Sequence, residues 1–220
     1  KRRGHSVGTP MSLENGWNFL REDHREKALQ IVREEKPFCL VLAFPCGPFS
    51  PLQRLNSKGR ETLDARQADG LVLMRFAIQL AQEQIKHGRH YILENPAGSK
   101  AWKLQEMLEW LEKFEAMMVK FDQCRFGLRC GATGLLHQKP TCLATSCQAV
   151  ISKFVNKRCM RNHLHAQVIG GSKVTAPAGR YPPLMARAIV QALEEQFEFD
   201  FGRQLADSVN FPSHGVQALE

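Results

Sequence analysis

The sequence feature that most constrains the fold is a continuous apolar run, Phe38–Phe44, which stops abruptly at Pro45-Cys46-Gly47-Pro48. A short unbroken apolar run bounded by turn residues is typical of a strand buried on both faces of a sheet. The segments that follow alternate between helical periodicity and short apolar runs: 63–86, 90–93, 101–114 and 117–121. Alternating strands and helices with short connections predict an α/β fold, built on a parallel, doubly wound, Rossmann-like sheet.

Two further helices are expected outside this core, over residues 23–35 and 183–197. Residues 123–173 are irregular and rich in cysteine, so they are expected to form a basic insertion. A chain of 220 residues is long enough for one domain with a sizeable core. We therefore divide the chain into an α/β domain over 1–122 and 174–200, the insertion over 123–173 and a tail over 201–220.

The net charge of +8 is concentrated between residues 120 and 173. This stretch contains nine Lys and Arg residues against one Asp, and the rest of the chain is neutral. A local basic field favours binding to a phosphate backbone, although a basic surface that maintains solubility is the alternative. The candidate nucleic-acid contacts are Arg129, Lys153, Lys157, Arg158, Arg161 and Lys173.

Cysteine content and hydropathy indicate the compartment. No apolar run approaches the roughly 18 residues of a membrane span, so no membrane partner is expected. Seven cysteines without an N-terminal secretory signal are typical of reduced thiols. We therefore expect an intracellular protein, nuclear or cytoplasmic.

Two chemically active side chains directly follow predicted strands: Cys46 after the first, and Glu94 after the second. In open parallel sheets, ligands bind beyond the carboxyl ends of the strands, so both side chains are expected to face one crevice. A thiol and a carboxyl group suit nucleophilic attack on an electron-poor ring with proton assistance. The alternatives are a small buried cysteine and a glutamate that caps a helix or pairs with a lysine.

The residues around both positions resemble motifs of the DNA (cytosine-5)-methyltransferases. Ala43–Ser50 is similar to the family's Gly-Phe-Pro-Cys-Gln-Pro-Phe-Ser motif, and Glu94-Asn95-Pro96 is similar to its Glu-Asn-Val motif. Three further blocks resemble the family in order, in the variant form of phage-type and retroelement-encoded members: Asp64–Gly70, Cys124–Gly127 with Gln138–Thr141, and Tyr181–Ile189. The resemblance covers roughly residues 14 to 195.

This resemblance implies a mechanism. Cys46 would attack C6 of a cytosine flipped out of duplex DNA, and Glu94 would hold N3 and the exocyclic amine. Lys139 or Arg125 would oppose the negative charge that develops on the base. The implied methyl donor is S-adenosylmethionine, with candidate contacts at Trp17, Asn18, Pro45 and Gly179.

The same resemblance leaves a second function open. The family's glycine-rich Phe-x-Gly-x-Gly cofactor motif is absent from the 220 residues, whereas the basic stretch falls where the family has its target-recognition segment. The alternative is therefore an inactive methyltransferase remnant that binds nucleic acid within a larger, retroelement-type polyprotein.

The cysteines and histidines of the expected insertion raise the question of a metal. Cys159-x₃-His163-x-His165 has a spacing suited to metal ligands, and the candidates for a structural zinc are Cys124, Cys142, Cys159 and His163. However, no Cys-x-x-Cys pair occurs in the sequence. The pattern therefore favours buried thiols with surface histidines over a metal site.

Overall fold

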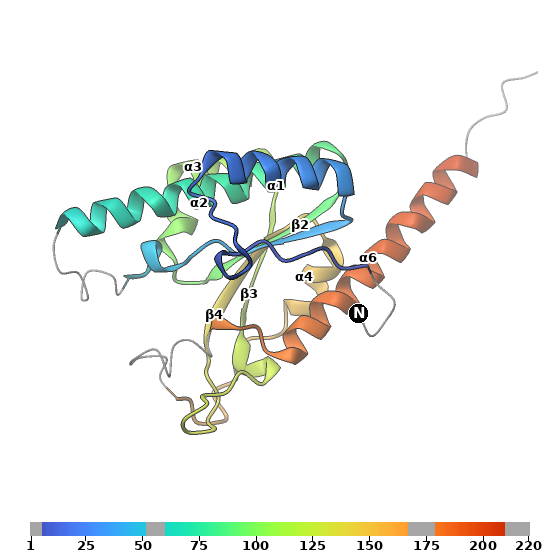
Figure 1. Ribbon diagram of the computed structural model, residues 1–220. Helices are drawn as coiled ribbons and strands as arrows, with labels where there is room; N and C mark the ends of the chain where they lie inside the picture. Colours follow the sequence, from blue (N-terminus) through green and yellow to red (C-terminus); the bar gives the residue numbers. More distant parts are fainter. Residues whose placement is uncertain (1–5, 52–59, 167–178, 210–220) are drawn as a thin grey trace, which may run out of the picture.

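The computed structural model describes residues 6–51, 60–166 and 179–209 and shows an α/β fold (Figure 1). Its elements are, in chain order, η1 (Leu13–Asn15), α1 (Glu22–Glu35), β1 (Cys39–Leu42), η2 (Gly47–Phe49), α2 (Arg60–Lys86), β2 (His90–Pro96), η4 (Lys100–Lys103), α3 (Gln105–Lys113), β3 (Met117–Asp122), η5 (Gln123–Phe126), β4 (Pro140–Thr145), α4 (Gln148–Phe154) and α6 (Pro183–Val209). Each strand and helix expected from the apolar pattern is present, with shifted ends. None of the described helices combines the length and apolar character of a membrane span.

The sheet is open and mixed, with the strand order β1-β2-β4-β3. β1 and β2 run parallel and are joined through α2, whereas β4 runs antiparallel to both of its neighbours. The expectation of a wholly parallel sheet is therefore wrong. A parallel connection needs a long crossover, usually a helix, but β3 and β4 are joined through η5 and irregular chain that returns directly alongside β3.

Helices cover both faces of this sheet, as a doubly wound arrangement requires. α1, α2 and α3 lie over one face, whereas α4 and α6 lie over the other (Figure 1). The alternation of side chains along β2 separates the two cores, because Tyr91 and Leu93 pack into the first and Ile92 packs into the second. All three side chains are fully buried, and each contributes about 1.5–3 kcal/mol to stability.

β1 is less enclosed than its apolar sequence predicts. Val41 remains 46% exposed, and β1 lies at one end of the strand order. The expectation that this strand is buried on both faces is therefore wrong for Val41, because helices cover the first core side of β1 more completely than the other.

The expected insertion contributes directly to the sheet. β4 and α4 lie within residues 123–173, and β4 occupies an inner position between β2 and β3. α6 continues to Val209, beyond the helix end expected at 197 and into the expected tail. Its sequence tolerates this because strong helix formers continue past a single glycine, Gly202.

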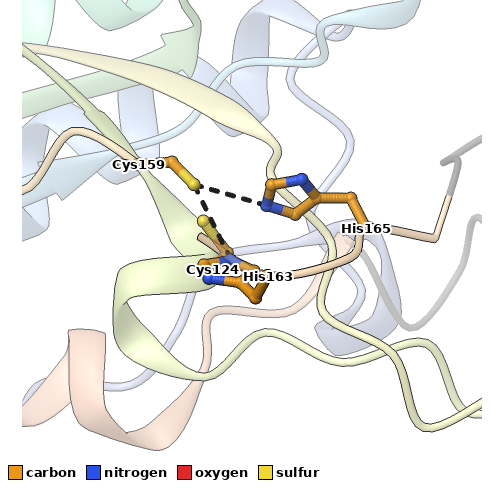
Figure 2. A group of neighbouring side chains, drawn as sticks. All are labelled: Cys124, Cys159, His163 and His165. Carbon is orange, nitrogen blue, oxygen red and sulfur yellow. Dashed lines mark hydrogen bonds between the residues drawn. The ribbon is translucent and has the colours of Figure 1, made fainter. Parts of the chain in front are cut away.

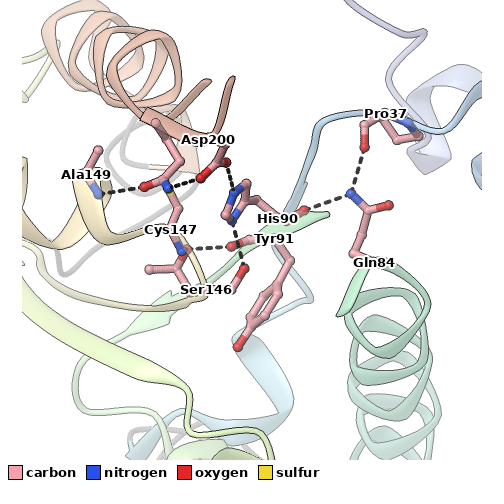
Figure 3. A network of polar contacts seen from close by, with 10 residues as sticks. Pro37, Gln84, His90, Tyr91, Ser146, Cys147, Ala149 and Asp200 are labelled. Atoms are coloured by element: carbon pink, nitrogen blue, oxygen red, sulfur yellow. Dashed lines mark hydrogen bonds and ion pairs between the residues drawn. The ribbon is translucent and has the colours of Figure 1, made fainter. Parts of the chain in front are cut away.

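A polar network at the start of β2 joins the two faces of the sheet (Figure 3). His90 Nε2 lies 2.8 Å from Asp200 Oδ2 of α6, and its Nδ1 lies 3.2 Å from Ser146 Oγ. On the other face, the amide of the fully buried Gln84 donates to the carbonyl oxygens of Pro37 and His90. The network therefore fixes α6 and α2 to the end of the sheet opposite the residues that follow β1 and β2.

Candidate functional site

A rigid turn presents Cys46 to solvent just after β1. Cys46 precedes η2, and its carbonyl oxygen accepts a hydrogen bond from the Phe49 amide at 3.0 Å. The buried Phe49 ring packs edge-to-face on Phe44 with 5.7 Å between centroids, which anchors the turn to the core. Cys46 itself remains exposed, as a nucleophile must be to meet a substrate.

α2 packs against this loop through Gly70, which lies close to Pro48 and Phe49. A Cβ atom added to Gly70 would lie 2.5 Å from Cβ of Pro48, which is closer than van der Waals contact allows. Only glycine therefore permits α2 to pack directly on η2. Gly70 belongs to the block that resembles the segment leading into the family's intervening helix.

Asn95 brings the ends of β1 and β2 together. Its side-chain amide donates to the Phe44 carbonyl oxygen at 2.9 Å, and both groups are buried. Because β1 and β2 are parallel and in register from Cys39 opposite His90 onward, Cys46 and Glu94 emerge at the same edge of the sheet.

Glu94 is a buried carboxyl group at this edge, with an exposed fraction of 7%. Its Oε2 accepts a hydrogen bond of 3.1 Å from the Tyr181 hydroxyl, whereas its Oε1 is buried without a hydrogen-bond partner among the described residues. Burial raises the pKa of Glu94 above that of an ordinary glutamate, and the positive charge of Lys139 and the Tyr181 hydrogen bond oppose this shift. Oε1 is therefore a buried acceptor atom without a hydrogen-bond partner among the described residues.

Lys139 links Glu94 to Cys46 electrostatically. Burial raises the pKa of the Cys46 thiol; the charge of Lys139 opposes this rise, and the Glu94 carboxylate adds to it. All three side chains thus lie within electrostatic range of one another. Lys139 has a left-handed backbone with φ of 33°, immediately before β4, and such strain in a non-glycine residue is concentrated at functional sites.

The structure distinguishes between the two cations that the resemblance implied. Lys139 lies at the Cys46–Glu94 pair, whereas Arg125 is exposed on η5 and is not among the charges that act on either group. Sequence reasoning missed Tyr181 as a site residue. Its only signal was its place at the head of the last block of the resemblance, directly before the prolines that begin α6.

Two of the residues expected to hold S-adenosylmethionine, Trp17 and Asn18, have local contacts near the start of α1. The Asn18 side-chain oxygen accepts from the Leu20 amide at 3.1 Å, which stabilises the turn before α1. The Trp17 ring packs against Phe19 and the edge of His24. Pro45 and Gly179 are both exposed, and among the described residues no atom lies within 4 Å of a Cβ built on Gly179. The assignment of these four residues to S-adenosylmethionine stays a prediction.

The basic residues of the expected insertion differ in their contacts and exposure. Lys153 pairs with Glu195 at 2.5 Å, Arg158 pairs with the buried Asp122 at 3.0 Å, and Arg129 donates to the Gly134 carbonyl oxygen. Arg161 is exposed, Lys157 is partly exposed, and Lys173 lies outside the described residues. Three of the six candidates therefore have structural contacts of their own.

A second group of chemically active side chains lies at the end of β3. Cys124, Cys159, His163 and His165 each offer one ligand atom, and these atoms lie within 4.8 Å of one another (Figure 2). The group could hold a metal ion. The candidate Cys142 is not part of it, because that residue is fully buried within β4 opposite Asn95 and Lys120; His165 takes its place.

Two hollows of about 670 and 540 Å³ lie elsewhere, one between α2 and α3 and the other beside His90 and α6. Neither hollow is lined by Cys46 or Glu94. The candidate site is therefore identified from the positions of its side chains and not from either hollow. Comparisons of this chain with protein families, with curated proteins and with solved structures found no match.

Proposed function

We propose that this chain is a DNA (cytosine-5)-methyltransferase-like domain whose base-binding site consists of Cys46, Glu94, Lys139 and Tyr181. The observation that carries the proposal is the convergence of a solvent-accessible thiol and a buried carboxyl group under the charge of one lysine. The loop around Cys46 and the Glu-Asn-Pro segment at the end of β2 are the two places where the sequence most resembles that family.

The geometry supports covalent addition to a cytosine. The Cys46 thiolate forms a bond to C6, the C5=C6 π electrons shift to form a C4=C5 double bond, and the C4=N3 π electrons take a proton from Glu94 at N3. Burial raises the pKa of Glu94 and so favours the protonated carboxyl that this step needs. Lys139 favours the thiolate form of Cys46, and the thiol proton leaves to solvent because Cys46 is exposed.

The proposal also assigns a role to Tyr181. Its hydroxyl occupies Oε2 of Glu94 and leaves Oε1 to face the base. A glutamate held at one oxygen presents the other in a defined direction, as recognition of N3 and the exocyclic amine requires. Methyl transfer itself requires S-adenosylmethionine, for which Trp17, Asn18, Pro45 and Gly179 stay the predicted contacts.

A second candidate function is a non-catalytic nucleic-acid-binding module. Two observations favour it: the expected cofactor contacts Asn18 and Trp17 have local contacts of their own, and burial raises the pKa of the Cys46 thiol, which disfavours the thiolate. The basic stretch from 120 to 173 would then carry the function.

An adduct assay separates the two functions. Duplexes with random flanks would carry 2-pyrimidinone in place of one cytosine, because this ring accepts a thiolate at C6 without any methyl transfer. The proposal predicts a denaturant-resistant adduct that maps to the Cys46 peptide, is absent from Cys46→Ser and is weaker in Lys139→Met. Lys120→Met, on the exposed side of β3, is the matched control.

The outcomes are distinct. An adduct that persists in Cys46→Ser refutes the proposed nucleophile. Salt-dependent binding of the duplex with no adduct in the unmodified chain supports the second candidate instead. If the unmodified chain shows neither an adduct nor salt-dependent binding, both candidate functions are refuted.

A further inference from the structure

The Cys/His group at the end of β3 is independent of the proposed base site, and its geometry points to a bound metal. Its four side chains come from two stretches of chain: Cys124 lies in η5, and Cys159, His163 and His165 lie in the segment that follows α4. Figure 2 shows the two sulfur atoms and the two imidazole rings directed toward a common centre.

The distances within the group match a tetrahedral zinc site. Zn–S bonds of about 2.3 Å and Zn–N bonds of about 2.0–2.1 Å at tetrahedral angles place sulfur and nitrogen about 3.6 Å apart. The Cys159 sulfur lies 3.7 Å from His163 Nε2 and 3.4 Å from His165 Nε2. Packing of two thiols without a metal would not explain why two imidazole nitrogens also lie at this distance from the Cys159 sulfur.

The surrounding contacts orient the ligands as a metal requires. His163 Nδ1 lies 3.0 Å from the Asn162 side-chain oxygen, which places the proton on Nδ1 and leaves the Nε2 lone pair free. The Arg161 amide donates to the Cys159 sulfur at 3.3 Å, and the left-handed backbone of Arg161, with φ of 56°, makes this turn. A donor of this kind stabilises a thiolate.

Two further contacts fix the positions of Cys159 and His165. The Cys159 amide donates to the carboxylate of Asp122 at 2.8 Å. Asp122 lies two residues before the ligand Cys124. His165 forms an isolated bridge with Leu136, and the Ala166 amide donates to the Leu136 carbonyl oxygen at 2.8 Å. The ligand-bearing segment is therefore attached at both ends.

We propose that Cys124, Cys159, His163 and His165 bind one structural Zn²⁺ ion. Two thiolates and two neutral imidazoles form a closed donor set that balances the charge of Zn²⁺, and four protein ligands leave no open position for a catalytic water. The ion holds residues 157–166 against the end of β3. It thereby sets the position of the exposed Arg161 and of Lys157 beside the sheet.

Metal analysis of the full chain tests this proposal. The chain is produced with zinc in the medium, purified without chelator, and examined by native mass spectrometry. One zinc ion per chain is expected, and Cys159→Ser and His165→Ala should lose it. The matched controls are Cys46→Ser, at the other thiol site, and His87→Gln, in the exposed turn directly after α2; both should retain the ion.

Cobalt substitution keeps the test valid if a ligand variant fails to fold. The unmodified chain loaded with Co²⁺ should show the visible bands of a tetrahedral complex and a thiolate-to-cobalt charge-transfer band. His165→Cys should keep the ion and raise the charge-transfer intensity by about half, because three thiolates replace two.

Three results would overturn the proposal: a chain that binds no zinc or cobalt, a Cys159→Ser variant that retains the full metal content, or a purified chain in which Cys124 and Cys159 are joined as a disulfide. The readout does not involve Cys46 chemistry. Failure of the base-site proposal therefore leaves the metal proposal standing, and the reverse also holds.

Discussion

Asp122 offers the most direct quantitative test of how the segment after α4 is held to the sheet. The residue ends β3 and is only 1% exposed. Its carboxylate accepts hydrogen bonds from the Cys159 amide at 2.8 Å, the Arg158 guanidinium at 3.0 Å and the Gln138 side chain at 3.4 Å. Asp122→Ala removes the acceptor for all three donors.

The cost can be worked out from the exposure of each donor. The Cys159 amide and the Gln138 side chain each lose about 1–3 kcal/mol when left without an acceptor, with the long Gln138 contact at the lower end. Arg158 is half exposed, so it regains water and adds little. The expected loss in the free energy of unfolding is about 3 kcal/mol, which corresponds to a fall in Tm of about 6–12 °C for a chain of this size. Asp122→Asn keeps one acceptor oxygen and should lose about half as much.

Urea unfolding followed by tryptophan fluorescence measures the effect, with chelator present in all samples so that metal binding does not contribute. Asp64→Ala, an exposed aspartate on α2, is the control and should change stability by less than about 0.5 kcal/mol. If Asp122→Ala lies within about 1 kcal/mol of the unmodified chain, the buried carboxylate does not hold this segment, and the reasoning is refuted.

Two further predictions follow from the charges around Cys46. The first concerns alkylation of Cys46 by iodoacetamide at neutral pH, followed by peptide mass spectrometry. Alkylation should slow in Lys139→Met and accelerate in Glu94→Gln, because Lys139 lowers and Glu94 raises the pKa of the thiol. Lys120→Met should leave the rate unchanged, and equal rates in all variants would contradict the proposed proximity. Because burial raises the pKa of Glu94 in the folded state, the contribution of Glu94 to stability should fall as pH rises from about 4.3, its unfolded pKa, through its folded pKa. Stability measured across this window should therefore shift in favour of Glu94→Gln as pH rises, and a shift in the opposite direction would show that Glu94 is held as a carboxylate.

The parts of the fold that sequence predicted well are those with long or uninterrupted apolar patterns. Phe38–Phe44 and the periodicity of residues 63–86 correspond to β1 and α2. Cys46 follows β1 as predicted, whereas Glu94 lies within the last residues of β2 and not after it, because pairing with β4 extends that strand to Pro96. These predictions depend on local patterns and on one neighbouring strand pair.

The parts that sequence did not predict depend on pairing between distant segments. β4 is six residues long, begins at Pro140 and follows irregular chain, so its sequence does not distinguish it from a loop. Its place between β2 and β3 is determined by tertiary packing, which overrides local preference. The choice of His165 over Cys142 follows from the same fact, because pairing in β4 buries Cys142 inside the sheet.

The order of the residues in the base site has a consequence for how the protein is made. Cys46 and Glu94 are synthesised before Lys139, which directly precedes β4, the strand that pairs between β2 and β3. Tyr181 is synthesised after all three. A nascent chain that stops before β4 leaves the edge of β2 unpaired and the Glu94 carboxyl without the charge of Lys139. The four side chains therefore come together only after Tyr181 has been synthesised, and a chain that stops before β4 is expected to be an aggregation-prone fragment that lacks the assembled site.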